Sequence, residues 1–222
     1  MAKRSPLSKD SIADKAIDIA DKGGINALSM RNLAAELGIQ AMSLYHHFKT
    51  KEELLSYMAD KLLTSFENPV ADPQSNDWRS IVQQRAIAAK ELFRIHPWLP
   101  FVIDAQVHSG EKRLAYLNNY LGILRKAGLP IELALKVSSL IDSYIYGYCL
   151  QLSHVADDER TREELAEEFS QGFDSSLYPF LFEASSLVMA QGYDAEADFC
   201  FGLNVLLDGI ALAISSITKS DT

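Results

Sequence analysis

Hydrophobic residues recur at every third or fourth position along nearly the whole chain of 222 residues. This spacing places apolar side chains on one face of a helix, whereas a half-buried strand shows strict alternation. No alternating stretch is sustained between turn signals. The pattern therefore predicts an all-α fold.

Four short helices are predicted at the amino-terminal end, each bounded by residues that start or stop helices. Ser8 and Ser29 suit two of the starts, because a serine hydroxyl accepts a hydrogen bond from the first helical turn. Glycines suit the stops, since glycine adopts a left-handed backbone at little cost. Thr50 and Glu53 have the spacing of a capping box. The four helices are predicted between Ser8 and Gly23, between Ser29 and Gly38, from Gln40 to about Phe48 and from Thr50 to about Phe66.

Turn-forming residues and two prolines at 67–77 are predicted to join this head to a larger body. In the body, the charged run at 156–168 is predicted to be a solvated loop and a helix start. A helix or broken helix is expected at 173–190. We place the domain boundary after residue 54, giving a three-helix head at 1–54 and a helical-bundle body at 55–222.

The last helix of the chain is apolar around most of its circumference, as Phe199, Phe201, Leu203 and Val205 illustrate. Such a helix is typically wholly buried. The final helix of a chain seldom forms the core of a monomer, so a subunit interface that covers its outer face is the simpler explanation.

The charge of the chain is distributed unevenly. The net charge is −9, but residues 1–51 carry eight Lys/Arg and five Asp/Glu, a balance of +3, which leaves −12 for the remainder. A basic end on an acidic body is the asymmetry expected when one end meets a polyanion. The alternative is chance, because an excess of three charges is modest.

The remaining composition predicts a cytoplasmic protein without a membrane segment. No uncharged apolar run reaches the roughly 18 residues that a membrane span needs. The first residues lack the apolar region of a secretory signal. Only two cysteines occur, Cys149 and Cys200, so a disulfide framework is excluded and a reducing compartment fits.

The segment QAMSLYHHFKTKEELL, residues 40–55, concentrates histidines, aromatic residues and lysines. A metal site is disfavoured, because His46 and His47 point about 100° apart on a helix and helical ligand pairs lie three or four residues apart. A catalytic base is also disfavoured, since a helix of this length between polar turns makes a poor pocket wall. We therefore predict no metal and no catalytic residue.

The third interpretation is a nucleic-acid surface. The helices at 29–37 and 40–48, joined by a turn at Gly38, form a helix-turn-helix unit, whose second helix can enter the major groove. Leu44 and Phe48 form the inward face that seats this helix. The alternative is that Tyr45 and His47 merely pack against the first helix.

In the DNA interpretation, the first residues of the second helix meet base edges. Gln40 can pair with adenine, and Ala41 or Met42 can touch a thymine methyl group, with Ser43 beside them. Tyr45 and His47 would face the flanking strands and Lys51 a phosphate, while His46 can reach either.

The segment ALSMRNLAAELGIQAMSLYHHFKTKEELL resembles the DNA-binding head of the tetracycline-repressor (TetR) family. The matching elements are LSMRNLAAELGI, SLYHHF and KTKEELL. More loosely, LRKAGLPIELALKVSSLIDSYIYGYCLQ and FCFGLNVLLDGI are similar to the carboxy-terminal ligand-binding body of the tetracycline-repressor subgroup. Together these segments cover nearly the whole chain.

The resemblance implies a homodimeric, all-helical transcriptional regulator that binds an operator in double-stranded DNA. It implies a repressor released from a palindromic operator by a small molecule. We predict no cofactor. An activator or a redox sensor of the same family, using Cys149 and Cys200, is the alternative. An all-α enzyme is a distant alternative, because the sequence shows no Ser/His/Asp set, glycine loop or metal spacing. The predicted DNA-binding residues are Ser29, Arg31, Gln40, Ala41, Met42, Ser43, Tyr45, His46, His47 and Lys51.

The ligand site is predicted from aromatic and polar residues on the body helices, because an apolar cavity with a few polar groups is the usual ligand site. Asp104 lies in the apolar stretch PFVIDAQV and would suit a cationic or hydroxylated ligand. The alternative is that most of these residues belong to the core or an interface. The predicted ligand-binding residues are Trp98, Phe101, Asp104, Tyr116, Tyr120, Tyr144 and Tyr148.

Overall fold

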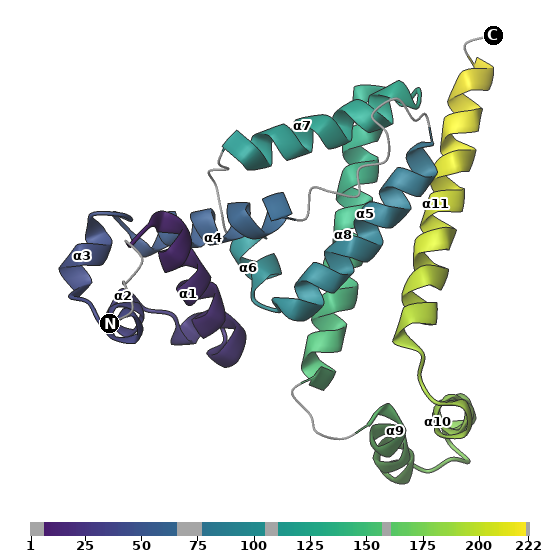
Figure 1. Cartoon of the computed structure of the whole chain (residues 1–222). Helices are drawn as coiled ribbons and strands as arrows, with labels where there is room; N and C mark the ends of the chain where they lie inside the picture. The colour runs from purple at the N-terminus through teal and green to yellow at the C-terminus, as the bar shows by residue number, and fades with distance from the viewer. Residues whose placement is uncertain (1–6, 66–76, 105–110, 157–160, 221–222) are drawn as a thin grey trace. The chain divides into compact units, whose positions relative to one another are not determined.

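The computed structural model describes residues 7–65, 77–104, 111–156 and 161–220. These residues form eleven α-helices and one 3-10 turn, and none of them lies in a strand. The predicted all-α fold is confirmed (Figure 1). The chain divides into two compact units, Met1–Ile145 and Tyr146–Thr222, which are described separately here.

The first unit begins with a small group of packed helices. The helix α1 contacts α2, α2 contacts α3, and α1 also contacts α4. The helices of this group are α1 (Lys9–Gly23), the 3-10 turn η1 (Ile25–Ala27), α2 (Met30–Leu37), α3 (Ala41–Tyr45) and α4 (Lys51–Ser65).

The predicted helix boundaries at α1 and α2 are confirmed. The Ser8 hydroxyl accepts a hydrogen bond from the N–H of Ser11 at 3.1 Å, and the Ser29 hydroxyl accepts one from Asn32 at 3.1 Å. Gly24 follows α1 with φ of 71°, and Gly38 ends α2 in the left-handed conformation with φ of 65°. Side chains with a Cβ rarely adopt such positive φ angles, which is why glycine stands at these stops.

The third helix is shorter than predicted, since α3 ends at Tyr45 rather than near Phe48. The backbone N–H groups of His47 and Phe48 both donate to the carbonyl of Leu44 at 2.9 Å, which closes the helix in a turn. Phe48 is fully buried and anchors this turn in the core. His46 and His47 therefore lie in a turn and not on a helix.

The rest of the first unit consists of further helices around an apolar core. The helices are α5 (Trp78–Ile95), α6 (Leu99–Asp104), α7 (Glu111–Lys126) and α8 (Ile131–Ala156), which continues past Ile145 into the second unit. Fully buried side chains include Val82, Leu99, Leu124 and Ile141. Pro97 lies between α5 and α6, and Gly128 follows α7 with φ of 93°. The predicted break at 67–77 lies almost wholly outside the described residues.

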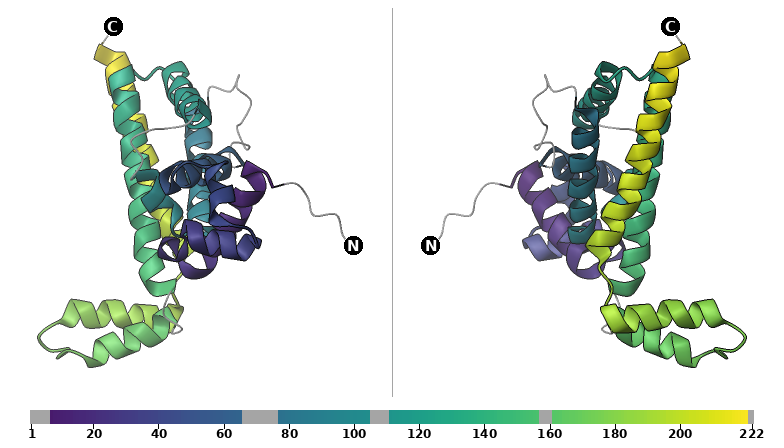
Figure 2. Two further views of the ribbon diagram at one scale, coloured as in Figure 1. Left: turned by 90° about the vertical axis from the view of Figure 1, so that its left-hand side faces the viewer. Right: turned by 90° about the vertical axis from the view of Figure 1, so that its right-hand side faces the viewer.

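The second unit contains the end of α8 and three further helices: α9 (Arg162–Gln171), α10 (Pro179–Gln191) and α11 (Ala195–Ser220). The helices α9 and α10 pack side by side as a hairpin (Figure 2). The expected helix or broken helix at 173–190 is corrected here, because α10 starts only at Pro179, where proline suits the first helical turn. The charged run supplies α9, which Thr161 and Glu164 start with a capping box.

The last helix, α11, is buried on one face only in a single chain. Phe199 and Leu203 are fully buried, whereas Phe201 is 72% exposed and Leu212 70% exposed. By length and composition, Ala195–Ser216 could also cross a membrane, with a mean hydropathy of 1.7. The sequence predicted that α11 is completely buried. This can hold only if a second surface packs against its outer face.

Candidate nucleic-acid interface

The helix α3 is anchored by its apolar side and exposes the opposite side. Leu44 and Phe48 are completely buried, whereas Met42 is 69% exposed and Tyr45 41% exposed. Gln40 precedes the helix, and its side chain makes no capping hydrogen bond. The side of α3 that carries Met42 and Tyr45 is therefore open to solvent in a single chain.

The other residues predicted to contact DNA lie along the same part of the chain. Gln40, Arg31, Ser29 and His46 are exposed, and the remaining four are half-buried: Ala41, Ser43, His47 and Lys51. The Ser29 hydroxyl is engaged in capping α2, so its structural role is established by the geometry. The contact of each residue with DNA stays a prediction.

The positive charges of the head fall into two groups. On α1, Lys9 pairs with Glu53 at 3.2 Å, Lys15 with Glu36 at 2.9 Å and Lys22 with Asp18 at 2.6 Å. Within the described residues, Arg31, Lys49 and Lys51 form no ion pair. Among the described residues of the head, the cations without an ion pair thus lie on α2 and in the segment that follows α3.

Contacts between α1 and α4 hold α3 in place. The Lys9 ammonium lies 5.0 Å from the ring centre of Phe48, which stacks edge-on against Tyr57 at 5.4 Å. The Tyr57 hydroxyl donates to the Asp10 carboxylate at 3.1 Å. The Glu53 carboxylate accepts a hydrogen bond from the backbone N–H of Lys49 at 2.7 Å, and this bond lowers the pKa of Glu53.

Two connections join this head to the other helices of the first unit. The helix α4 packs against α6 and α7. The Asp21 carboxylate at the end of α1 accepts a hydrogen bond from the Trp98 indole N–H at 2.7 Å and lies 2.8 Å from Nδ1 of His96. A change at α6 or in the turn that precedes it therefore has direct contacts through which it can act on α4 and α1.

The residues predicted to bind ligand do not form one group. Trp98 is engaged with Asp21, and Phe101 is 56% exposed. Tyr148, in the second unit, donates to the backbone carbonyl of Ala195 and stacks on Phe199. Tyr144 is half-buried, and the side chain of Asp104 lies outside the described part of the chain. Their ligand contacts stay predictions.

Tyr116 and Tyr120, one helical turn apart on α7, do come together, around Arg85 of α5. The Arg85 Nε donates to the Tyr116 hydroxyl, and Nη2 donates to the Asp142 carboxylate of α8 at 2.8 Å. The guanidinium carbon lies 4.1 Å from the ring centre of Tyr120. Sequence reasoning missed Arg85, although its position three residues after Val82 and four before Ala89 places a charge on the apolar face of α5.

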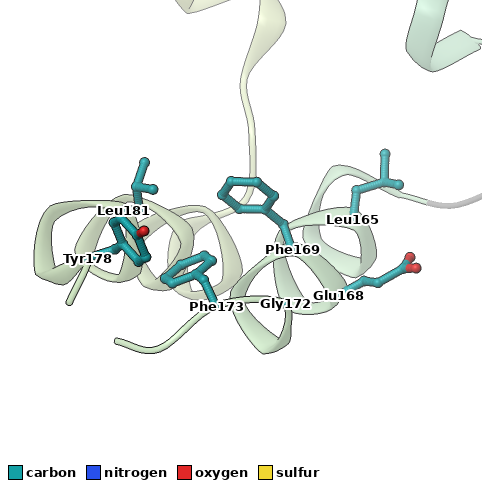
Figure 3. Close-up of a pocket in the computed structure, with 7 residues that line it drawn as sticks. All are labelled: Leu165, Glu168, Phe169, Gly172, Phe173, Tyr178 and Leu181. Atoms are coloured by element: carbon teal, nitrogen blue, oxygen red, sulfur yellow. The ribbon is translucent and has the colours of Figure 1, made fainter. Parts of the chain in front are cut away.

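The hairpin of α9 and α10 contains a separate open hollow of about 680 Å³. Phe173 lies between Phe169 and Tyr178, edge-on to both rings at 5.3 and 6.0 Å (Figure 3). None of the residues predicted to bind ligand lines it.

The part of the chain that the structure describes shows neither a metal-ligand cluster nor a disulfide. Those residues contain no group of three His, Cys, Asp or Glu side chains able to hold a metal ion. Cys149 and Cys200 are not joined in a disulfide, and both are half-buried.

Comparison with known proteins identifies the whole arrangement. Residues 12–58 match the family described as bacterial regulatory proteins, tetR family, and residues 69–214 match the tetracyclin repressor-like, C-terminal domain. The chain belongs to the TetR family. The resemblance seen in the sequence is thus confirmed over both parts of the chain.

Several relatives of this TetR-family protein are named as repressors. It is 30% identical to the HTH-type transcriptional repressor DrrR1 of Streptomyces coeruleorubidus, over 94% of this chain and 79% of that protein. It is 26% identical to the class D tetracycline repressor protein of Escherichia coli, over 96% and 93%. The crystal structure of ActR from Streptomyces coelicolor in complex with actinorhodin covers 95% of this chain and 99% of its own, with 26% identity and a TM-score of 0.77.

The TetR-family protein is therefore a ligand-responsive, DNA-binding transcriptional repressor, as the sequence predicted. Its relatives are transcriptional regulators and not enzymes, and regulators of this family bind operator DNA and small molecules. The head, with its exposed α3, lies within the residues that match the tetR family of bacterial regulatory proteins.

Proposed function

We propose that this protein is a cytoplasmic homodimer that binds a near-palindromic operator through the exposed side of α3 and leaves it when a small molecule binds. The observation that supports this best is the coincidence of exposure and charge. Lys49 and Lys51 follow the exposed helix α3 in the chain, and Arg31 lies on α2, which contacts α3. These three cations form no ion pair within the described residues, while the lysines of α1 are paired within the head.

Each contact has a chemical role in this proposal. Gln40 hydrogen-bonds a base edge, and Met42 makes apolar contact with a thymine methyl group. Tyr45 and His47 hydrogen-bond the flanking sugar-phosphate strands, and Lys51 neutralises a phosphate. Because Ala41 and Met42 cannot form strong hydrogen bonds, DNA shape contributes more to specificity than usual.

A second copy of the chain would cover the outer face of α11. Phe201, Val205 and Leu212 are exposed there in a single chain, and large exposed apolar patches mark interaction sites. Because the protein is a DNA-binding regulator, we expect another protein surface, and not a membrane, to cover these exposed apolar side chains. The twofold axis would then set the two copies of α3 about 34 to 36 Å apart, one turn of DNA.

Release requires that the effector bind more tightly to the form of the dimer whose heads do not fit the operator. The contacts of α4 with α6 and α7, and of Asp21 with Trp98, support α4 and α6 as the parts that transmit the change. The complex of the related ActR with actinorhodin supports an organic effector bound in the body.

Selection of binding sites from random duplex DNA, with the full-length protein, tests the proposal. We expect near-palindromic sites with half-sites one helical turn apart. The double variant Tyr45→Ala with Lys51→Ala should fail to bind the selected DNA, whereas Lys22→Ala should bind normally, because Lys22 pairs with Asp18 on α1. Equal binding by the parent and the double variant would contradict the assignment of the interface.

A further inference from the structure

The group formed by Arg85, Tyr116, Tyr120 and Asp142 has more hydrogen-bonding capacity than its protein partners use. We infer that Arg85 and Tyr120 bind an anionic oxygen, a carboxylate, sulfonate or phenolate, on an aromatic effector. This inference rests on the proposed function, since it names the chemical class of the molecule that causes release.

The guanidinium of Arg85 is held on two of its three nitrogens. Nε donates to Tyr116, and Nη2 donates to Asp142. The third nitrogen, Nη1, is buried and has no hydrogen-bond partner among the described residues. The hydroxyl of Tyr120 is also buried and unpaired within that part of the chain, although Tyr120 is only 3% exposed.

Unpaired polar groups of this kind cost free energy in an interior, so most buried groups in proteins have partners. The two groups here are neighbours, because the guanidinium lies over the Tyr120 ring with 4.1 Å from its carbon to the ring centre. Both can donate, since Nη1 has two N–H groups and a tyrosine hydroxyl has one. A single acceptor atom placed between them would satisfy both.

The charge of the group favours an anionic acceptor over a neutral one. Burial opposes the charge of Arg85, but Asp142 and the two tyrosines more than compensate, so the pKa of Arg85 is raised and the guanidinium stays charged. Burial raises the pKa of Tyr120 to about 12, so its hydroxyl keeps its proton. Hydrogen bonds between a charged donor and a charged acceptor are shorter and stronger than neutral ones.

Asp142 does not occupy the free edge of the guanidinium. Its carboxylate binds Nη2, and its side chain is 31% exposed against 13% for Arg85, so water screens much of its charge. An anion at Nη1 would approach a different edge, next to the faces of two tyrosine rings. The rings favour an aromatic framework, whereas the guanidinium disfavours a cationic ligand of the kind expected at Asp104.

Two fluorescent probes test the inference on the full-length protein. Anilinonaphthalene sulfonate is an aromatic anion, and Nile red is a neutral aromatic dye. We expect Arg85→Gln to weaken binding of the anion at least tenfold while leaving Nile red within twofold. Binding of either dye to exposed apolar faces elsewhere on the protein should be the same for every variant, so it does not contribute to the difference between variants. Arg94→Gln is the matched control, because Arg94 is exposed on the same helix and pairs only with Glu91 among the described residues.

Tyr120→Phe provides an independent variant, since Arg85→Gln leaves Asp142 without its partner and can unfold the chain. The change removes only the unpaired hydroxyl. We therefore expect a melting temperature equal to or above that of the parent, together with weaker binding of the anion and unchanged binding of Nile red.

Equal affinity of the parent and Tyr120→Phe for the anion would overturn the inference, and so would a parent that binds Nile red but not the anion. In both cases effector binding in the body would still stand. If the parent bound neither dye, the ligand-binding function of the body would be contradicted as well.

Discussion

At the scale of single residues, the five-residue helix α3 depends on two side chains for its position. Leu44 and Phe48 are completely buried, and the turn that follows α3 closes on the carbonyl of Leu44. A helix this short has little stability of its own. The packing of these two residues therefore keeps Gln40 and Tyr45 outward.

We predict that Leu44→Ala lowers the free energy of unfolding by roughly 2 to 5 kcal/mol, because it leaves a cavity in the core of the head. Met42→Ala, at 69% exposure two residues away, should change stability by no more than about 0.5 kcal/mol. Urea unfolding followed by circular dichroism measures both. Similar values for the two variants would show that Leu44 does not anchor α3.

We also predict that Gln40→Ala and Lys51→Ala weaken DNA binding in different ways. Loss of Gln40 should relax the choice at one base pair by roughly 1 to 3 kcal/mol, because only a base-edge contact is removed. Loss of Lys51 should reduce affinity similarly for every DNA sequence, because it removes a phosphate contact. Competition binding with single-base variants of the selected site separates the two roles. A uniform loss with Gln40→Ala would exclude base contact by that residue.

At the scale of elements, start and stop residues made the helices of the head predictable. Ser8, Ser29 and Gly38 act locally, so their effect can be read from neighbouring residues. The early end of α3 could not be predicted, since it depends on the burial of Phe48 against α1 and α4. The start of α10 at Pro179 was missed, although Asp174, Ser175 and Ser176 in the preceding turn are typical turn-forming residues.

The candidate sites show the same limit. Exposure of Met42 and Tyr45 followed from helical spacing, because Leu44 had to face inward. The pairing of Trp98 with Asp21, 77 residues apart, could not be seen in the sequence. Arg85 was missed because its partners come from α7 and α8, which only the folded chain brings together.

The contact between α1 and the start of α6 yields a prediction of its own. Trp98→Phe removes the indole N–H from Asp21, and a hydrogen bond to a charged group contributes about 1.5 to 3 kcal/mol. We expect a loss of stability in that range in urea unfolding. Tyr178→Phe, an exposed position in the α9–α10 hairpin, serves as the control and should show no change. Unchanged stability of Trp98→Phe would mean that this contact contributes nothing to the link between head and body.

At the scale of the whole molecule, the proposal requires a pair of chains with basic heads and acidic bodies. A net charge of −12 outside the first 51 residues disfavours contact of the body with DNA. Only the head should then attract phosphate. The domain boundary after residue 54 stays a prediction, and the family matches end and begin on either side of residues 59–68.

We predict that Leu212→Arg converts the dimer into single chains, because it places a charge on the exposed apolar face of α11. Leu114→Arg, a comparably exposed position on α7, should leave the dimer intact. Analytical ultracentrifugation reports both. The monomeric variant should also bind the selected DNA at least a hundredfold more weakly, since the second head is no longer held near its half-site. A parent protein that sediments as a single chain would contradict the proposed dimer.

The most direct test of the central claim is the salt dependence of DNA binding, measured by fluorescence anisotropy on the selected site. For the parent, the logarithm of affinity should fall steeply with the logarithm of salt concentration, because each neutralised phosphate releases counterions. In Lys51→Ala the slope should become shallower by about one, since one phosphate is no longer neutralised, whereas Lys22→Ala should keep the parental slope. If Lys51→Ala retains both the affinity and the slope of the parent, the face formed by α3 and the start of α4 is not the surface that binds DNA.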